Sequence, residues 1–243
     1  MKDPLSIMAV ISGACYAFGY YRTPFVLAGL LLQISYLVLR GIALDRLPLV
    51  GPHDTLFLLS ASIVLFMLPV ARKMKGSKSK AVMHAAIGMA VFFLGLSFFY
   101  TPHNSPLPPV LRTFWFETHV AFSFFSYALF ALAAIFGVVS LVRGDTEEDA
   151  VQYKMVLVGY CFFSAAMIFG GIWAYLAWGT YWLWTPKELW TVILWLFYSF
   201  YLHARLRPWW TGRPVNVLAI AGFVIVMFTY LGVGLFMKSS HSF

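Results

Sequence analysis

Four tryptophans gather within thirteen residues, in the segment 178–190, which reads WGTYWLWTPKELW. They are Trp178, Trp182, Trp184 and Trp190, with Tyr181 between them. Tryptophan and tyrosine collect at membrane interfaces without a special function, and this accounts for one or two of these residues. Four in so short a segment, with Gly179 to bend the chain, indicate an aromatic surface for a flat apolar ligand. A porphyrin is such a ligand.

A helix is predicted to start inside the same segment. Thr185 suits the N-cap, Pro186 suits the first helical position, and Glu188, three residues after the cap, completes a capping box. A purely structural role for Thr185 and Glu188 therefore stays open beside a contribution of Glu188 to the ligand site.

The histidines could bind iron, because neutral imidazole is a normal axial ligand of haem. Of the six in the chain, His119 begins the apolar run 118–142 and His241 lies in the short tail after the last run. Both should lie at the level of the tryptophan-rich segment. The sequence around His53, His84 and His103 contains no motif, so we interpret these three as interface or loop residues.

His203 lies near the end of the apolar run 189–206 and shares one helical face with Glu188, Trp195 and Ser199. At 1.5 Å per residue, His203 is about 22 Å from Glu188 along the helix. Ionisable residues inside apolar runs are costly and usually functional. We expect this polar stripe to face the interior of a helix bundle rather than lipid.

The elements that carry these residues are membrane spans. Hydrophobic residues make up 61% of the 243-residue chain and charged residues 11%, against about 45–50% and about 25% in soluble domains. The apolar runs near the length of a spanning helix predict an all-α, polytopic membrane protein with about eight transmembrane helices, forming one integral membrane domain over residues 1–243. The runs are 4–21, 24–44, 55–71, 81–100, 118–142, 155–177, 189–206 and 215–236.

Basic residues between the runs predict the orientation. Eleven lie in one set of alternate connections and five in the other, and the richer set should face the cytoplasm. Both termini and the connections 45–54, 101–117 and 178–188 then lie outside, while Arg40 sits inside a run. The net charge of +8 is spread over these connections, which does not suggest a nucleic-acid partner. Cys15 and Cys161 form no Cys-x-x-Cys pair, so a thiol–disulfide carrier is not expected.

The tryptophan-rich segment resembles the WWD motif, roughly WGxYWxWDPKExW, of the cytochrome c assembly protein family of the CcsA/ResC type. The similarity extends to THVAFSFFSYALF at 118–130, WLFYSFYLHAR at 195–205 and GVGLFMKSSHSF at 232–243. It covers most of residues 110–243, whereas residues 1–100 match only in layout. The family usually has aspartate where this chain has Thr185; both residues cap a helix, but the negative charge is absent here.

The resemblance implies haem transport and presentation for covalent attachment to apocytochrome c. It assigns His119 and His241 as external ligands of haem b, which is both ligand and substrate, and His203 as a transmembrane ligand near the cytoplasmic side. Basic residues on the outer side could pair with the haem propionates; these are Arg112, Lys187 and Lys238. The residues expected to contact haem are His119, His241, His203, Trp178, Trp182, Trp184, Trp190, Gly179 and Glu188.

The implied partners are a CcsB/ResB-like membrane protein, apocytochrome c, haem and the lipid bilayer of the cytoplasmic membrane. No side chain is assigned a catalytic role, because the reactive groups belong to haem and its substrate; the chain would be a haem-handling subunit of a cytochrome c synthase (haem lyase) complex. Two alternatives stay open. One is a haem-handling protein that passes haem to a chaperone or regulates haem synthesis. The other is a small-molecule transporter, although the sequence contains neither the repeats nor the broken helices common in that class.

Overall fold

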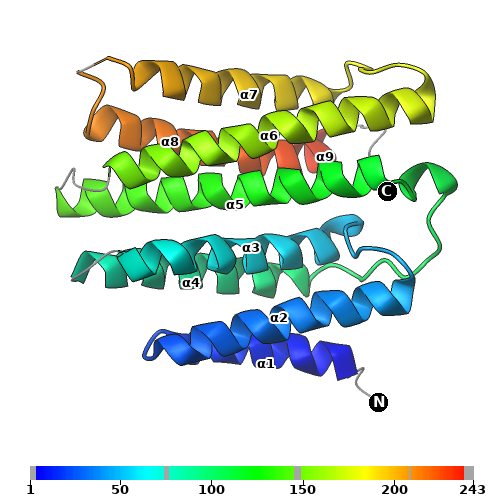
Figure 1. Cartoon of the computed structure of the whole chain (residues 1–243), viewed down its shortest axis with the longest axis horizontal. Helices are drawn as coiled ribbons and strands as arrows, with labels where there is room; N and C mark the ends of the chain where they lie inside the picture. Colours follow the sequence, from blue (N-terminus) through cyan, green and yellow to red (C-terminus); the bar gives the residue numbers. More distant parts are fainter. Residues whose placement is uncertain (1–3, 74–76, 145–148, 208, 238–243) are drawn as a thin grey trace. The chain divides into compact units, whose positions relative to one another are not determined.

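The structure is a computed structural model that describes residues 4–73, 77–144, 149–207 and 209–237. Over these ranges the chain is helical, without a β-strand, which confirms the all-α polytopic membrane fold. The residues cluster into two compact units, residues 1–112 and residues 113–243. Figure 1 shows the helices of each unit packed side by side.

Every predicted run coincides with a helix, but the described helices are not all equally suited to span a bilayer. Six are long and apolar enough to cross: α2 (Thr23–Leu44), α3 (Gly51–Lys73), α4 (Ser77–Ser97), α5 (Phe114–Arg143), α6 (Asp149–Trp178) and the run formed by α8 (Arg213–Met227), η2 (Phe228–Gly232) and α9 (Val233–Phe236). α1 (Pro4–Gly19) is apolar but shorter. α7 (Pro186–Ala204) is not among the six. Six spans are therefore supported by length and composition, and α1 and α7 remain predicted ones.

In the first unit, buried polar side chains join the helices. The Tyr16 hydroxyl on α1 donates to Gln33 Oε1 on α2 at 2.6 Å, and Gln33 Nε2 donates to the Phe57 carbonyl of α3 at 3.1 Å. Ser60 of α3 donates to the Ala90 carbonyl of α4 at 2.8 Å. The spare lone pairs of helix carbonyls thus serve as acceptors between helices.

A buried ion pair joins the end of α2 to the start of α3. Arg40 Nε and Nη2 donate to the two carboxylate oxygens of Asp54 at 2.7 and 3.0 Å, and both residues are buried. Arg40 Nη1 also donates to Asn104 Oδ1 at 3.1 Å, and Arg46 Nη2 donates to the His103 carbonyl at 2.8 Å. The proline-rich segment before the short 3₁₀ helix η1 (Pro109–Leu111) is thereby tied to the α2–α3 corner.

Two of the remaining histidines differ from simple loop residues. The prediction that His53 lies in an outer loop is wrong: His53 is buried in the first turn of α3, and its Nδ1 lies 2.9 Å from Asp54 Oδ1. α3 begins four residues before the predicted run because this pairing lets its polar first turn be buried. His84 stacks on Tyr20, with ring centroids 3.8 Å apart. His103 lies outside the helices, as predicted.

In the second unit, α5 is the core helix, and residues 126–137 are all buried. It packs along α6 and α8 (Figure 1). Tyr201 on α7 donates to Gln152 Oε1 on α6 at 3.0 Å, and Gln152 Nε2 donates to the Ala133 carbonyl on α5 at 3.1 Å. One buried glutamine therefore connects three helices.

The ion pair gives a stability prediction. Asp54→Ala removes the only carboxylate that contacts Arg40 among the described residues, leaving a buried cation, and breaking such a pair costs about 3–5 kcal/mol. We expect a clearly lower midpoint of thermal unfolding for the detergent-purified protein. Asp45→Asn is the matched control, because the Asp45 side chain is 97% exposed, its contact with Arg112 is 3.4 Å long, and asparagine tolerates the φ of 51° at this position. Equal midpoints for the two variants would contradict the proposed role of the pair.

Candidate functional site

His119 lies in the second turn of α5 and is fixed by a contact with α6. Its Nδ1 lies 2.8 Å from the carbonyl oxygen of Ala166. Because a carbonyl only accepts, Nδ1 carries the hydrogen and donates it, which leaves a lone pair on Nε2. Histidines that ligate a metal normally donate their other ring N–H in this way. The tautomer of His119 is therefore the one that an iron ligand needs.

Trp173 connects this histidine to the tryptophan-rich segment. Its ring is nearly parallel to that of His119, at 17° with centroids 6.4 Å apart, and it meets Trp178 edge to face at 4.9 Å. Phe116 contacts Trp173 from α5 at 5.1 Å. The sequence did not single out Trp173, which is 3% exposed, because it lies within an apolar run upstream of the motif.

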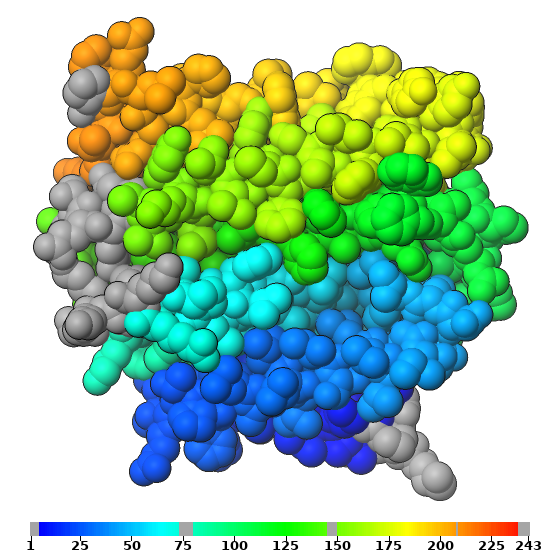
Figure 2. Space-filling view, viewed as in Figure 1, coloured from blue at the N-terminus to red at the C-terminus, as the bar shows by residue number. Residues whose placement is uncertain are grey.

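The loop between α6 and α7 is held in a bent conformation. α6 ends at Trp178, and Gly179 follows with a φ of 74°, which glycine adopts without strain. Trp184 has a φ of 55°, which costs a residue with a side chain about 1–3 kcal/mol. Figure 2 shows this segment, in yellow, at the surface of the second unit.

Glu188 holds the loop in this conformation. Its Oε2 accepts the backbone N–H groups of Leu183 and Thr185, both at 2.9 Å, on either side of Trp184. The Thr185 hydroxyl accepts the Glu188 N–H at 3.4 Å, which confirms the predicted capping box. Glu188 is 8% exposed, and its carboxylate is engaged by the loop. Glu188 therefore positions the loop, and threonine supplies the cap that aspartate would supply.

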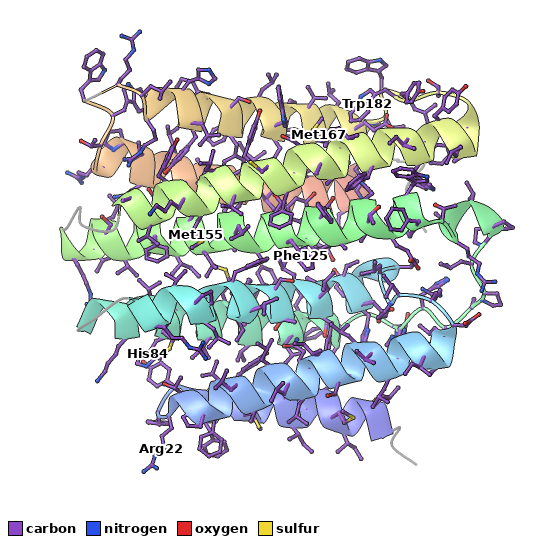
Figure 3. The ribbon with its side chains drawn as sticks, viewed as in Figure 1. Arg22, His84, Phe125, Met155, Met167 and Trp182 are labelled. Atoms are coloured by element: carbon purple, nitrogen blue, oxygen red, sulfur yellow. The ribbon has the colours of Figure 1, made fainter. Side chains whose placement is uncertain are left out.

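The four tryptophans of the motif do not form one flat surface. Trp182 and Trp184 are inclined by 76°, and Trp190 packs edge to face on Phe228 of the π-helix η2 at 4.5 Å. Trp184 is 68% exposed, whereas the indole N–H of Trp182 (Figure 3) is buried and makes no hydrogen bond in the described part of the chain. The loop thus presents exposed ring faces beside one unsatisfied donor.

The candidate propionate partners differ in their surroundings. Lys187, half-buried in the first turn of α7, lies close enough to His119 to act on it electrostatically. Arg112 belongs to the first unit and faces the exposed Asp45. Lys238 and His241 lie outside the described residues, so the predicted pairing of His119 with His241 stays a prediction.

The polar stripe of α7 faces α6 over most of its length. Trp195 Nε1 donates to Ser164 Oγ at 3.0 Å, and Ser199 Oγ lies 2.7 Å from the Tyr160 hydroxyl. His203 is exposed, however, so the prediction that the whole stripe faces the interior is wrong at this end. Its Nδ1 bonds to the Ser199 carbonyl at 2.8 Å, within its own helix, which leaves a lone pair on Nε2.

Comparisons with known proteins point to one family. The family model described as cytochrome C assembly protein matches residues 50–241. A "Cytochrome c biogenesis protein CcsA" of Parasynechococcus marenigrum (strain WH8102) is 30% identical, over 99% of this chain and 90% of its own length. Another protein of that name, from Chlamydomonas reinhardtii, is 34% identical over 57% of this chain, and the match spans 43% of its own length.

Among solved structures, "Cytochrome c Heme Lyase CcmF" superposes with a TM-score of 0.68 at 18% identity. The likeness covers 97% of this chain and 46% of that protein, so it concerns the fold and less than half of the larger molecule. The family model and the nearly full-length relative, in contrast, match this chain by its sequence, so they show the family and not the fold alone. The chain belongs to the cytochrome c assembly protein family.

Proposed function

We propose that this protein receives haem in the membrane and presents it, at the end that carries the α6–α7 loop, for covalent attachment to apocytochrome c. One observation carries the proposal. The Nδ1–H of His119 is donated to Ala166, so that Nε2 is left with a lone pair beside the Trp173–Trp178 ring pair. The similarity to a cytochrome c biogenesis protein and, in fold, to a cytochrome c haem lyase supports the same role.

In this proposal haem b is bound non-covalently as a substrate. His119 would supply one nitrogen to the haem iron and His241, from the C-terminal tail, would supply a second. Displacement of one histidine by a histidine of the apocytochrome would couple transfer to release. The chain's own contribution is to bind and orient haem and to keep the ring faces of Trp178 and Trp184 available for it.

The propionates would be held by Lys187, assisted by the buried indole N–H of Trp182. Among the residues that the structure describes, Lys187 makes no ion pair with a carboxylate and Trp182 Nε1 has no acceptor. A half-buried ammonium and an unsatisfied donor both gain from a carboxylate ligand, because each loses the cost of a buried polar group without a partner. Arg112 is the weaker candidate, since Asp45 already faces it.

At the other end of α7, His203 would be the ligand that first takes up haem. Its exposure leaves room for a second ligand from a partner, and a CcsB/ResB-like membrane protein is the partner we propose. The loop and both termini would face the outside of the cytoplasmic membrane, as the distribution of basic residues predicts.

The external site is tested by cytochrome c maturation in cells that carry His119→Ala or His241→Ala. We expect each variant to lose most mature cytochrome, because one axial bond is removed, and added imidazole to restore part of it. His84→Ala is the control, since His84 contacts Tyr20 in the first unit. If both variants mature cytochrome c as the wild type does, at normal protein levels and without imidazole, the two histidines are not haem ligands. The tryptophan-rich loop is then only an aromatic belt at the membrane interface.

The propionate contact is tested by Lys187→Met. A hydrogen bond to a charged group contributes about 1.5–3 kcal/mol, so haem should dissociate about 10–100-fold more readily from the purified variant. Titration with haem and a haem analogue with esterified propionates is the measurement. The loss should be large for haem and small for the ester, and Arg112→Met should change neither. A Lys187→Met variant that retains wild-type affinity for both would exclude this contact.

The inner ligand is tested by His203→Gly. Removing the imidazole should lower the haem that co-purifies, and added imidazole should restore part of it, because the space left by the ring can admit the free ligand. Absorption spectra of the detergent-purified protein, with and without imidazole, give the readout. Haem content and spectrum identical to those of the wild type would remove His203 from the path.

A further inference from the structure

The contact between α5 and α6 at His119 depends on a residue without a side chain. A Cβ built on Gly170 would lie 2.6 Å from His119 Nδ1 and 2.9 Å from its Cε1. Both distances are shorter than non-bonded atoms tolerate, so any other residue at this position would displace the imidazole. The absence of a side chain at Gly170 therefore leaves the space on the surface of α6 that the imidazole ring occupies.

The same helical turn supplies the hydrogen-bond acceptor. In a regular α-helix the carbonyl of Ala166 pairs with the amide of residue 170, and this uses one of its two lone pairs. The second lone pair accepts His119 Nδ1–H at 2.8 Å. On the next turn, Trp173 lies nearly parallel to the imidazole. One short stretch of α6 thus has three effects on the imidazole. Gly170 leaves space for the ring, Ala166 orients it through a hydrogen bond, and Trp173 lies parallel to it.

We propose that Gly170 is a positioning residue that selects Nε2 of His119 as the iron-binding nitrogen and sets the plane of its imidazole. The inference rests on the proposed role of His119 as a ligand. A histidine whose second N–H is donated to a carbonyl is a stronger electron donor to the metal. The bond to Ala166 would therefore favour ferric iron and lower the reduction potential of a haem held by His119.

The adjacent glycine provides a matched control. The nearest atom to a Cβ built on Gly171 is the Tyr181 carbonyl oxygen at 3.7 Å, an ordinary van der Waals contact. Replacing either glycine by alanine changes the intrinsic helix propensity by the same amount. A difference between Gly170→Ala and Gly171→Ala therefore reports the contact with His119 and not a general effect on α6.

The experiment compares both full-length variants, purified in detergent, for haem affinity, absorption spectrum and reduction potential. Gly170→Ala should bind haem about 10–100-fold more weakly, the loss typical of a disturbed partner of a ligating histidine. Its low-spin bands should weaken, and the potential of the remaining haem should rise. Gly171→Ala should match the wild type. Identical affinity, spectrum and potential in the two variants would overturn the proposal.

A second set of variants, made in a protein that lacks the His119 side chain, separates an effect of Gly170 on the position of the imidazole from an effect on folding. In His119→Gly with added imidazole, the ligand is not tethered to α5 and can shift away from a Cβ at 170. Gly170→Ala should then cause no further loss, and the double variant should accumulate even if the single variant does not. An equal loss in both backgrounds would overturn the positioning role. If His119→Ala itself leaves haem binding unchanged, the proposed function fails instead, and the two failures are distinguishable.

Discussion

Water is not available inside a bilayer to satisfy a polar group, so each polar side chain of a spanning helix needs a partner within the protein. In this chain the carbonyls of neighbouring helices often act as that partner. Gln33 reaches Phe57, Ser60 reaches Ala90, and His119 reaches Ala166. Each bond joins one helix to another and thereby fixes their register. The orientation of His119 is one case of this general requirement, so the packing of α5 on α6 and the chemistry of the site depend on the same bond.

The sequence predicted those features that depend on neighbouring residues. Apolar runs gave the positions of the helices, because their length and composition are local properties. The capping box at Thr185 and Glu188 was predicted with its correct residues, since it is a contact over three positions. The bend at Gly179 followed from the freedom of glycine at a positive φ. The second role of Glu188, which accepts the N–H of Leu183, was not evident, because it depends on how the loop returns.

Contacts between helices far apart in the sequence could not be predicted in this way. Arg40 lies inside an apolar run, and no pattern in the sequence indicated its partner. The structure places Asp54 2.7 Å from it. The contact between His119 and Gly170 was also not predicted, although two adjacent glycines in an apolar run indicate a place where another helix can pack closely. The π-turn that brings Phe228 against Trp190 has no signature in the sequence. All three depend on the register between helices, which hydropathy does not encode.

Threonine at position 185 has an electrostatic consequence for the site. An aspartate there would also cap α7, but it would place a carboxylate two residues before Lys187. The Glu188 carboxylate is present in either case, and it accepts two backbone N–H groups of the loop. Thr185 keeps the cap through its hydroxyl and adds no second carboxylate beside Lys187. The loop is therefore more electropositive next to His119 than one with aspartate would be, which favours a ligand that carries carboxylates.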